Sequence, residues 1–237
     1  MGRQELLHEP GERGSWRRRL LWGAGVLLLG PLLLILVFRF VPVPVTPLML
    51  IRAAQGEGMR RDWVPLDSIA PALAEAVVAS EDNLFCRQSL GFDFEALRGE
   101  VEALMDGERA RGASTITMQT AKNLFLWPGR DFVRKGIEAW LTPQVAALWP
   151  KRRVMEVYLN IVEFGPGIYG AEAASRAFFN KPASALTRRE AARLAAVLPS
   201  PLTRSPTASS GAVPAQAAVI ERRIGQLGPL LDCVRGG

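Results

Sequence analysis

The chain has 237 residues, a formal net charge of +6 and a single histidine, His8. Beyond that residue the sequence excludes a Ser-His-Asp triad, a Cys-His pair and a histidine-based metal site, so acid–base chemistry there depends on carboxylates, lysine or tyrosine. The positive charge suits nucleic acid or anionic lipid. No nucleic-acid-binding motif is present, and we expect a lipid surface or a phosphorylated lipid as the partner.

An apolar segment lies near the N-terminus. Residues 20–38 carry no charge and form a segment long enough to cross a bilayer as a helix. Arg17–Arg19 directly precede this segment. The positive-inside rule then predicts an exported C-terminal part. A cleaved signal peptide is the alternative, although no clean cleavage site follows. The expected organisation is a cytoplasmic tail over 1–19, a transmembrane helix over 20–42, a polar linker over 43–63 and a domain over 64–237.

From Pro65 onward the hydrophobic pattern is helical almost throughout. No convincing alternating run predicts a strand, so we expect a mainly α domain. The loop of glycines 165, 167 and 170 and the segment 199–216 are expected to be irregular, and Thr187 with Glu190 forms a capping-box pattern. The expected helices cover about 67–80, 94–105, 114–125, 132–141 with a restart or kink at Pro143, 151–162, 187–198 and 217–227.

The run Arg-Gly-Ala-Ser-Thr-Ile-Thr-Met-Gln-Thr-Ala-Lys-Asn over 111–123 is the most informative in the chain. Gly112 leaves the backbone bare, so that a ligand can approach it closely. Hydroxyl and amide groups follow it, and Lys122 adds a cation. This combination suits a pocket for a sugar that carries phosphate. The alternative is an ordinary helix start with Ser114 as its cap.

Carboxylates and cations form a second pattern. Glu81 and Asp82 end an apolar helix, where partial desolvation suits a general base, although an exposed pair in a turn is the alternative. Glu138 lies on one helix face with Arg134, which predicts either a surface ion pair or part of a cationic site. Cations gathered near a carboxylate suit an anionic leaving group. These cations are Lys122, Arg130, Arg134, Lys135, Lys151, Arg152 and Arg153.

The two cysteines, Cys86 and Cys233, cannot build a zinc site. In an oxidising compartment they could form a disulfide that joins the C-terminus to the middle of the domain. Two separate thiols are the alternative.

Five segments together resemble the peptidoglycan glycosyltransferases (glycosyltransferase family 51). The run 111–123 is similar to that family's G-[AG]-S-T-I-x-x-Q-x-x-K-N segment, and 81–85 (EDNLF) to its E-D-x-x-F. Residues 134–138 (RKGIE) match R-K-x-x-E, and 151–160 (KRRVMEVYLN) match K-x-x-I-L-E-x-Y-L-N. Residues 164–181 resemble the fifth block. The segments occur in the family's order over about 64–200, without a transpeptidase domain, as in the monofunctional, membrane-anchored type.

The resemblance implies a lysozyme-like α fold that polymerises lipid II at the bacterial inner membrane, with the catalytic domain in the periplasm. Glu81 would deprotonate the 4-hydroxyl of the acceptor sugar, Glu138 would support the second site, and undecaprenyl pyrophosphate would leave with inversion. Mg2+ or Mn2+ could assist, and cell-wall synthesis or division proteins are possible partners. The implied substrate-binding residues are Gly112, Ser114, Thr115, Gln119, Lys122, Asn123, Arg130, Arg134, Lys135, Lys151 and Asn160.

The chain departs from the family pattern after Phe85. The family continues with x-x-H-x-G-F-D, whereas residues 86–93 read Cys-Arg-Gln-Ser-Leu-Gly-Phe-Asp, without a histidine and with one extra residue. Gln88 can replace the histidine as a hydrogen-bonding group but not as a charge. Met118 replaces the first glutamine of the usual pair. There are two alternatives to an active transferase. One is a weak or inactive family member that acts as a membrane-anchored scaffold, and the other is a lytic transglycosylase or muramidase of similar fold.

Overall fold

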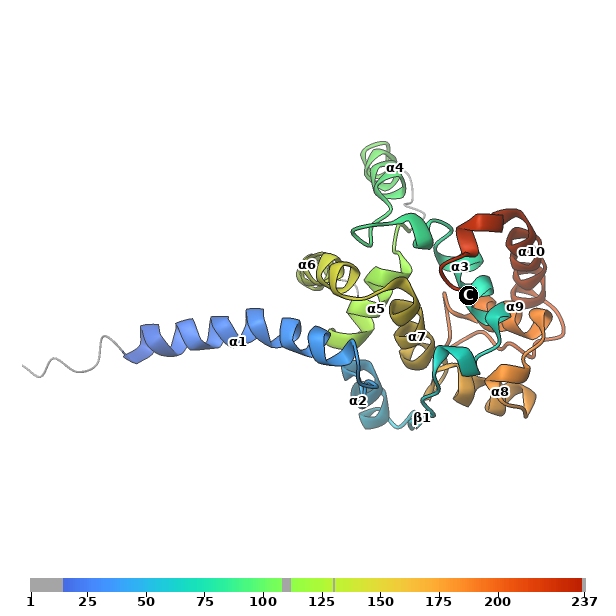
Figure 1. Ribbon diagram of the computed structural model, residues 1–237, viewed down its shortest axis with the longest axis horizontal. Helices are drawn as coiled ribbons and strands as arrows, with labels where there is room; N and C mark the ends of the chain where they lie inside the picture. The colour runs from blue at the N-terminus through green and yellow to red at the C-terminus, as the bar shows by residue number, and fades with distance from the viewer. Residues whose placement is uncertain (1–14, 108–111, 130, 236–237) are drawn as a thin grey trace, which may run out of the picture.

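The computed structural model describes residues 15–107, 112–129 and 131–235. Helices dominate them, which confirms the mainly α class (Figure 1). The α-helices are α1 (Ser15–Phe38), α2 (Pro47–Ala54), α3 (Pro71–Glu81), α4 (Phe94–Met105), α5 (Ile116–Phe125), α6 (Phe132–Leu148), α7 (Lys151–Ile161), α8 (Ala171–Phe179), α9 (Arg188–Val197) and α10 (Ala212–Leu227). Short 3-10 helices cover Leu66–Ser68, Phe85–Arg87, Ala183–Ala185 and Gly228–Leu231.

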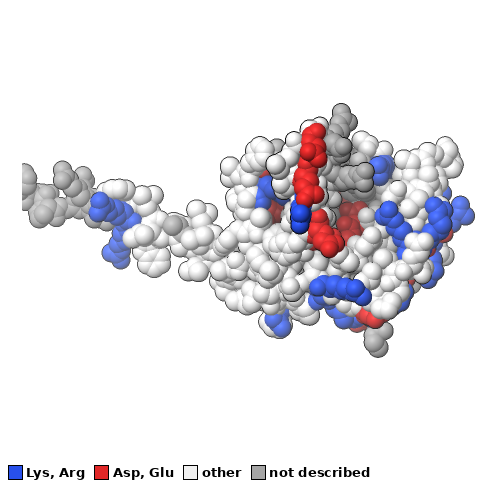
Figure 2. Space-filling view, turned by 90° about the horizontal axis from the view of Figure 1, so that it is seen from above, with Lys and Arg blue, Asp and Glu red and all other residues white. Residues whose placement is uncertain are grey.

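Helix α1 projects from the domain as one long rod (Figure 1). Its residues Trp16–Phe38 are long and apolar enough to cross a membrane. Figure 2 shows charged side chains on this helix only near its free end. In the sequence, Arg17–Arg19 directly precede the uncharged residues 20–38. The structure therefore contains the membrane-span candidate that the sequence predicts.

The C-terminal end of α1 packs against α6 and is held by side chains of α7 and of the turn between α6 and α7. The indole nitrogen of Trp149 donates to the Ile35 carbonyl at 2.7 Å, and the Arg153 guanidinium donates to the Phe38 carbonyl at 2.7 and 2.9 Å. The Ile35 carbonyl also accepts the backbone N–H of Arg39 at 3.0 Å, whereas the Phe38 carbonyl ends the helix, where carbonyls lack an intrahelical partner, and Arg153 supplies its donors. The side chain of Ile35 is fully buried there.

The segment 43–63 contains more structure than the polar linker expected from the sequence. Helix α2 begins with Pro47 at its first position, and the Thr46 hydroxyl caps it by accepting the N–H of Met49 at 3.4 Å. Met49 is fully buried in the main core. The helix has only eight residues, which is too short for a clear helical pattern in the sequence. Its packing against the core depends on the folded domain.

A small sheet also differs from the expectation of no strand. Its order is β1 (Arg60–Arg61), β3 (Ile168–Tyr169) and β2 (Glu163–Gly165). Strand β1 pairs parallel to β3, and β2 pairs antiparallel to β3. Strands of two or three residues are too short to show an alternating pattern, so they cannot be predicted from hydrophobic periodicity.

The domain core lies between two groups of helices. Helix α9 packs against α3 and α10, while α5 packs against α6 and α7. Helix α3 begins at Pro71 rather than near residue 67, because 66–68 form a separate 3-10 turn. Helix α6 continues through Pro143 without a restart, and α10 begins at residue 212 rather than 217. The predicted capping box at the start of α9 is confirmed.

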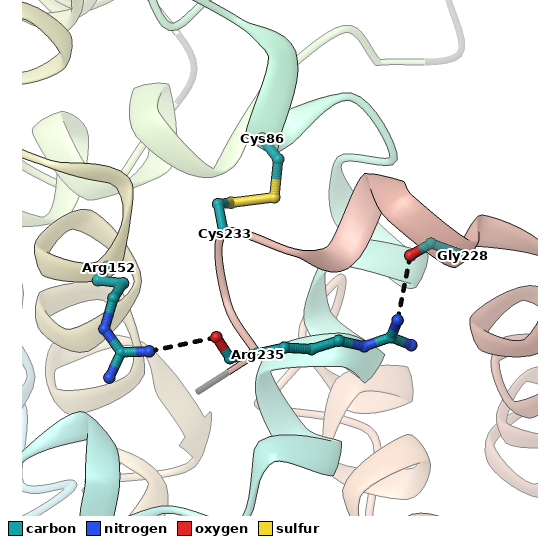
Figure 3. Close-up of a disulfide and its surroundings, with 5 residues drawn as sticks. All are labelled: Cys86, Arg152, Gly228, Cys233 and Arg235. Carbon is teal, nitrogen blue, oxygen red and sulfur yellow. Dashed lines mark hydrogen bonds between the residues drawn. A yellow bond between two sulfur atoms is a disulfide. The ribbon is translucent and has the colours of Figure 1, made fainter. Parts of the chain in front are cut away.

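Cys86 and Cys233 form a disulfide, which resolves the alternative left open by the sequence (Figure 3). Their Cα atoms are 5.5 Å apart, a normal separation for such a bond. Nearby, the Arg235 guanidinium donates to the Gly228 carbonyl at 3.2 Å, and the Arg235 carbonyl accepts from Arg152 at 3.5 Å. The C-terminal segment is thus attached to the loop that follows α3.

Candidate active site

A cleft of about 550 Å³ lies between the C-terminal end of α3, helix α5 and the first turns of α6. A smaller hollow of about 170 Å³ shares Glu81, Gly112 and Ser114 with it. The two hollows meet at one carboxylate, so a ligand in either one can contact Glu81. The predicted site residues that line the larger cleft are Glu81, Gly112, Ser114, Gln119, Lys122, Asn123, Arg134, Lys135 and Glu138.

Glu81 is the last residue of α3 and is half-buried. The amide nitrogen of Gln119 donates to its Oε2 at 3.0 Å, and the Ser80 hydroxyl donates to its Oε1 at 3.2 Å. These two donors hold the carboxylate in one orientation at the edge of the cleft. The geometry therefore provides an oriented, accessible carboxylate of the kind that a general base requires.

The cationic wall of the cleft is built around Glu138 on α6. Its Oε2 accepts from Arg134 Nη1 at 2.8 Å, and its Oε1 accepts from Lys135 Nζ at 2.9 Å. The side chains of Arg134 and Glu138 are only 8% and 3% exposed, so the pair is not the exposed surface pair considered from the sequence. Within the described residues, Arg134 Nε is buried and has no hydrogen-bond partner.

Lys122 adds a third cation, from α5, to the same cleft. Burial lowers the pKa of Lys122, and the nearby carboxylate of Glu138 opposes that shift. An ammonium group that has lost part of its water shell interacts more strongly with a phosphate oxygen than one in bulk water. The three cations thus suit a negatively charged ligand group.

The start of α5 orders the Gly112–Thr115 segment. The Thr115 hydroxyl accepts the N–H of Met118 at 3.1 Å and donates to the Gly91 carbonyl at 2.6 Å. The cap of α5 is therefore Thr115, and the alternative that Ser114 caps this helix is wrong. Ser114 instead faces the cleft, where its hydroxyl accepts from Lys135 at 3.3 Å. Thr115 is buried and lines the smaller hollow.

Asp82 joins the altered loop to the start of α5. Its Oδ1 accepts from the Gln88 amide at 2.7 Å, and its Oδ2 accepts from the N–H of Ile116 at 3.1 Å. Burial raises the pKa of Asp82 to about 6, and burial lowers the pKa of neighbouring Lys151 to about 8. Gln88 thus supplies a hydrogen bond in the loop that lacks the family's histidine.

Two of the predicted site residues that the structure describes, Lys151 and Asn160, line neither hollow. Lys151 Nζ lies 4.6 Å from the ring centre of Phe85 and lines neither hollow. Asn160 is buried and bonds to the backbone of Val64, at 3.0 Å through Oδ1 and 2.9 Å through Nδ2. Arg130 lies outside the described residues.

Sequence reasoning missed two charged residues of the cleft wall, Arg52 and Glu163. Arg52 Nε lies 3.8 Å from Glu163 Oε2, and burial raises the pKa of Glu163. Arg52 lies on α2, which was expected to be linker, and Glu163 lies on a three-residue strand. The position of Glu163 directly before the fifth matching segment was the only available signal.

The donor set does not fit a divalent ion held by protein ligands alone. In the described residues, no three His, Cys, Asp or Glu side chains converge as a metal site requires. The positive groups that face the cleft in the described residues are lysine and arginine side chains.

Residues 49–224 match the family model described as Transglycosylase. Relatives with the name biosynthetic peptidoglycan transglycosylase cover most of the chain. One from Caulobacter vibrioides is 54% identical over 177 residues, which is 75% of this chain and 77% of the relative. One from Aeromonas hydrophila is 48% identical over 226 residues, with 92% and 96% covered. The chain therefore belongs to the Transglycosylase family, whose lysozyme-like fold agrees with its mainly α domain.

Proposed function

We propose that this protein polymerises lipid II into the glycan strands of the bacterial cell wall, by inverting β-1,4 glycosyl transfer with release of undecaprenyl pyrophosphate. Membership of the Transglycosylase family and the names of its relatives support the reaction class. The observation that carries the proposal is that the Glu81 carboxylate and the cations Lys122, Arg134 and Lys135 line one cleft.

In this mechanism Glu81 takes the proton from the 4-hydroxyl of the acceptor sugar. The hydroxyl oxygen then attacks C1 of the growing strand, and the bond from C1 to the pyrophosphate oxygen breaks. Lys122, Arg134 and Lys135 stabilise the negative charge that develops on the leaving pyrophosphate. A base on one face and an anion-stabilising group on the other are what inverting transfer requires.

Glu138 has a different role from Glu81. Both of its oxygens accept from cations of α6, so it holds Arg134 and Lys135 in place on the cleft wall. Ser114, Gln119 and Asn123 supply hydroxyl and amide groups for the substrate's sugars. Lys151 and Asn160 line neither hollow, and they support the structure around the site instead of contacting the substrate.

The membrane is part of the proposed function. Helix α1 anchors the chain in the bacterial inner membrane, with Arg17–Arg19 on the cytoplasmic side and the catalytic domain in the periplasm. Its docked C-terminal end fixes the cleft relative to the bilayer that holds lipid II. Cell-wall synthesis or division proteins are proposed partners.

The test uses the full chain in detergent with labelled lipid II and separates the products by size. Wild-type protein is expected to make extended strands, and Glu81→Gln is expected to lose at least about a hundredfold in rate because it lacks a base. The matched control is Glu102→Gln, on exposed α4, whose carboxylate pairs only with Arg98 among the described residues; it should retain activity.

Other outcomes would overturn the proposal. Shortening of preformed glycan strands without extension of lipid II would identify a hydrolase or lyase. Wild-type protein that makes no product, or Glu81→Gln protein that extends lipid II at the wild-type rate, would remove the basis for catalysis by Glu81.

A further inference from the structure

A second hydrogen bond continues from Gln119 away from Glu81. The Tyr158 hydroxyl donates to Gln119 Oε1 at 3.1 Å, while Gln119 Nε2 donates to Glu81 Oε2 at 3.0 Å. Tyr158 lies on α7, Gln119 on α5 and Glu81 at the end of α3. A chain of two hydrogen bonds therefore connects a residue of the core to the carboxylate of the cleft across three helices.

The direction of these two bonds is fixed by chemistry. The carboxamide of Gln119 has an acceptor oxygen and a donor nitrogen at one end, and only the nitrogen can bond to an ionised carboxylate. Rotation of that amide by half a turn would direct its oxygen at Glu81, where two acceptors repel each other. In the observed orientation the Tyr158 hydroxyl donates to Gln119 Oε1 while Gln119 Nε2 donates to Glu81, so the amide makes both bonds at once.

Tyr158 is suited to remain a donor. Its side chain is fully buried, and burial raises the pKa of Tyr158 well above its usual value, with the charges of Glu81 and Asp82 adding to the effect. Helix α7 packs directly against α5, so the hydroxyl has a fixed position relative to Gln119.

We propose that Tyr158 is a positioning residue of the active site, which orients the Gln119 amide so that it holds the Glu81 carboxylate for proton transfer. This inference rests on the proposed role of Glu81 as the base. It assigns Tyr158 a function that its burial alone would not require, since a phenylalanine would fill the same space.

The test is a double-mutant cycle on kcat and KM for lipid II with the full chain. Tyr158→Phe removes one oxygen atom and should lower kcat about tenfold, the effect expected for one buried hydrogen bond. KM should stay within about twofold, because the cations that bind the pyrophosphate are unchanged. In a Gln119→Met background, which has no amide to orient, Tyr158→Phe should lower kcat no further.

The matched control is Thr120→Val, which removes a buried hydroxyl next to Gln119 that bonds to the Ile116 carbonyl at 2.8 Å. It should leave kcat unchanged, and circular dichroism of each variant verifies folding. An unchanged kcat in Tyr158→Phe, an equal loss in both backgrounds, or an equal loss in Thr120→Val would overturn the role of Tyr158 while wild-type activity upholds the proposed function. Wild-type protein that extends no lipid II would overturn both.

Discussion

Removal of the disulfide between Cys86 and Cys233 should destabilise the domain by an amount that follows from its span. The bond joins residues 147 positions apart. In the chain-entropy account, a closed loop of that length restricts the unfolded chain by about 5 kcal/mol at room temperature. For a chain of this size we expect a decrease in Tm of roughly 10–20 °C.

The measurement is thermal unfolding of the full chain in detergent, followed by circular dichroism, for wild-type protein and for Cys86→Ser/Cys233→Ser. Either single serine variant should match the double variant, because each breaks the same bond. Wild-type protein unfolded without reductant should show no thiol that can be alkylated. A Tm for the double variant within about 2 °C of wild type would refute the reasoning. Two reactive thiols in the membrane-isolated protein would also contradict the proposed export, since disulfides persist in oxidising compartments.

Three further substitutions test other parts of the structure. Burial raises the pKa of Asp82 from 3.8 to about 6, so its contribution to stability is full only below about pH 3 and is lost as the pH rises through 6. Between about pH 4 and 7 the unfolding free energy of wild type should fall by about 2 kcal/mol relative to Asp82→Asn, and parallel urea-unfolding profiles would contradict this. Gly167→Ala should lower the free energy of unfolding by at least about 2 kcal/mol in the same urea-unfolding assay. The φ of Gly167 is +65°, and a Cβ at this position would overlap the Glu57 carbonyl oxygen. An unchanged urea midpoint would show that Gly167 does not adopt this conformation. Thr115→Ala should cost about 2 kcal/mol, because α5 loses its cap to Met118 and the Gly91 carbonyl loses its donor. A neutral effect would argue against that cap.

The parts of the site that the sequence predicted are local in the chain. Arg134 and Glu138 are four residues apart on one helix, so their contact follows from helix geometry alone. Residues 112–122 form one continuous segment. The small residues, hydroxyl groups and cation of this segment are enough to predict a pocket from the sequence alone. Glu81 was indicated by its position at the end of an apolar helix.

The parts that could not be predicted depend on contacts distant in sequence. Arg52 reaches the cleft wall beside Glu163 only because α2 and β2 fold together. Gln119 accepts a hydrogen bond from Tyr158, which is 39 positions away. Lys151 belongs to a matching segment, yet it faces Asp82 and the ring of Phe85 rather than the cleft. A motif alone does not distinguish a residue that contacts a ligand from one that supports the fold.

The central claim is that one cleft separates two tasks, proton transfer by Glu81 and retention of pyrophosphate by the cations. The most direct measurement compares lipid II affinity and turnover for Glu81→Gln and Lys122→Met in the full chain. We expect Glu81→Gln to bind lipid II within about threefold of wild type while turnover falls at least about a hundredfold. Lys122→Met should bind at least about tenfold more weakly, because a half-buried cation on the pyrophosphate is lost. Full turnover by Glu81→Gln, or wild-type affinity of Lys122→Met, would contradict the account.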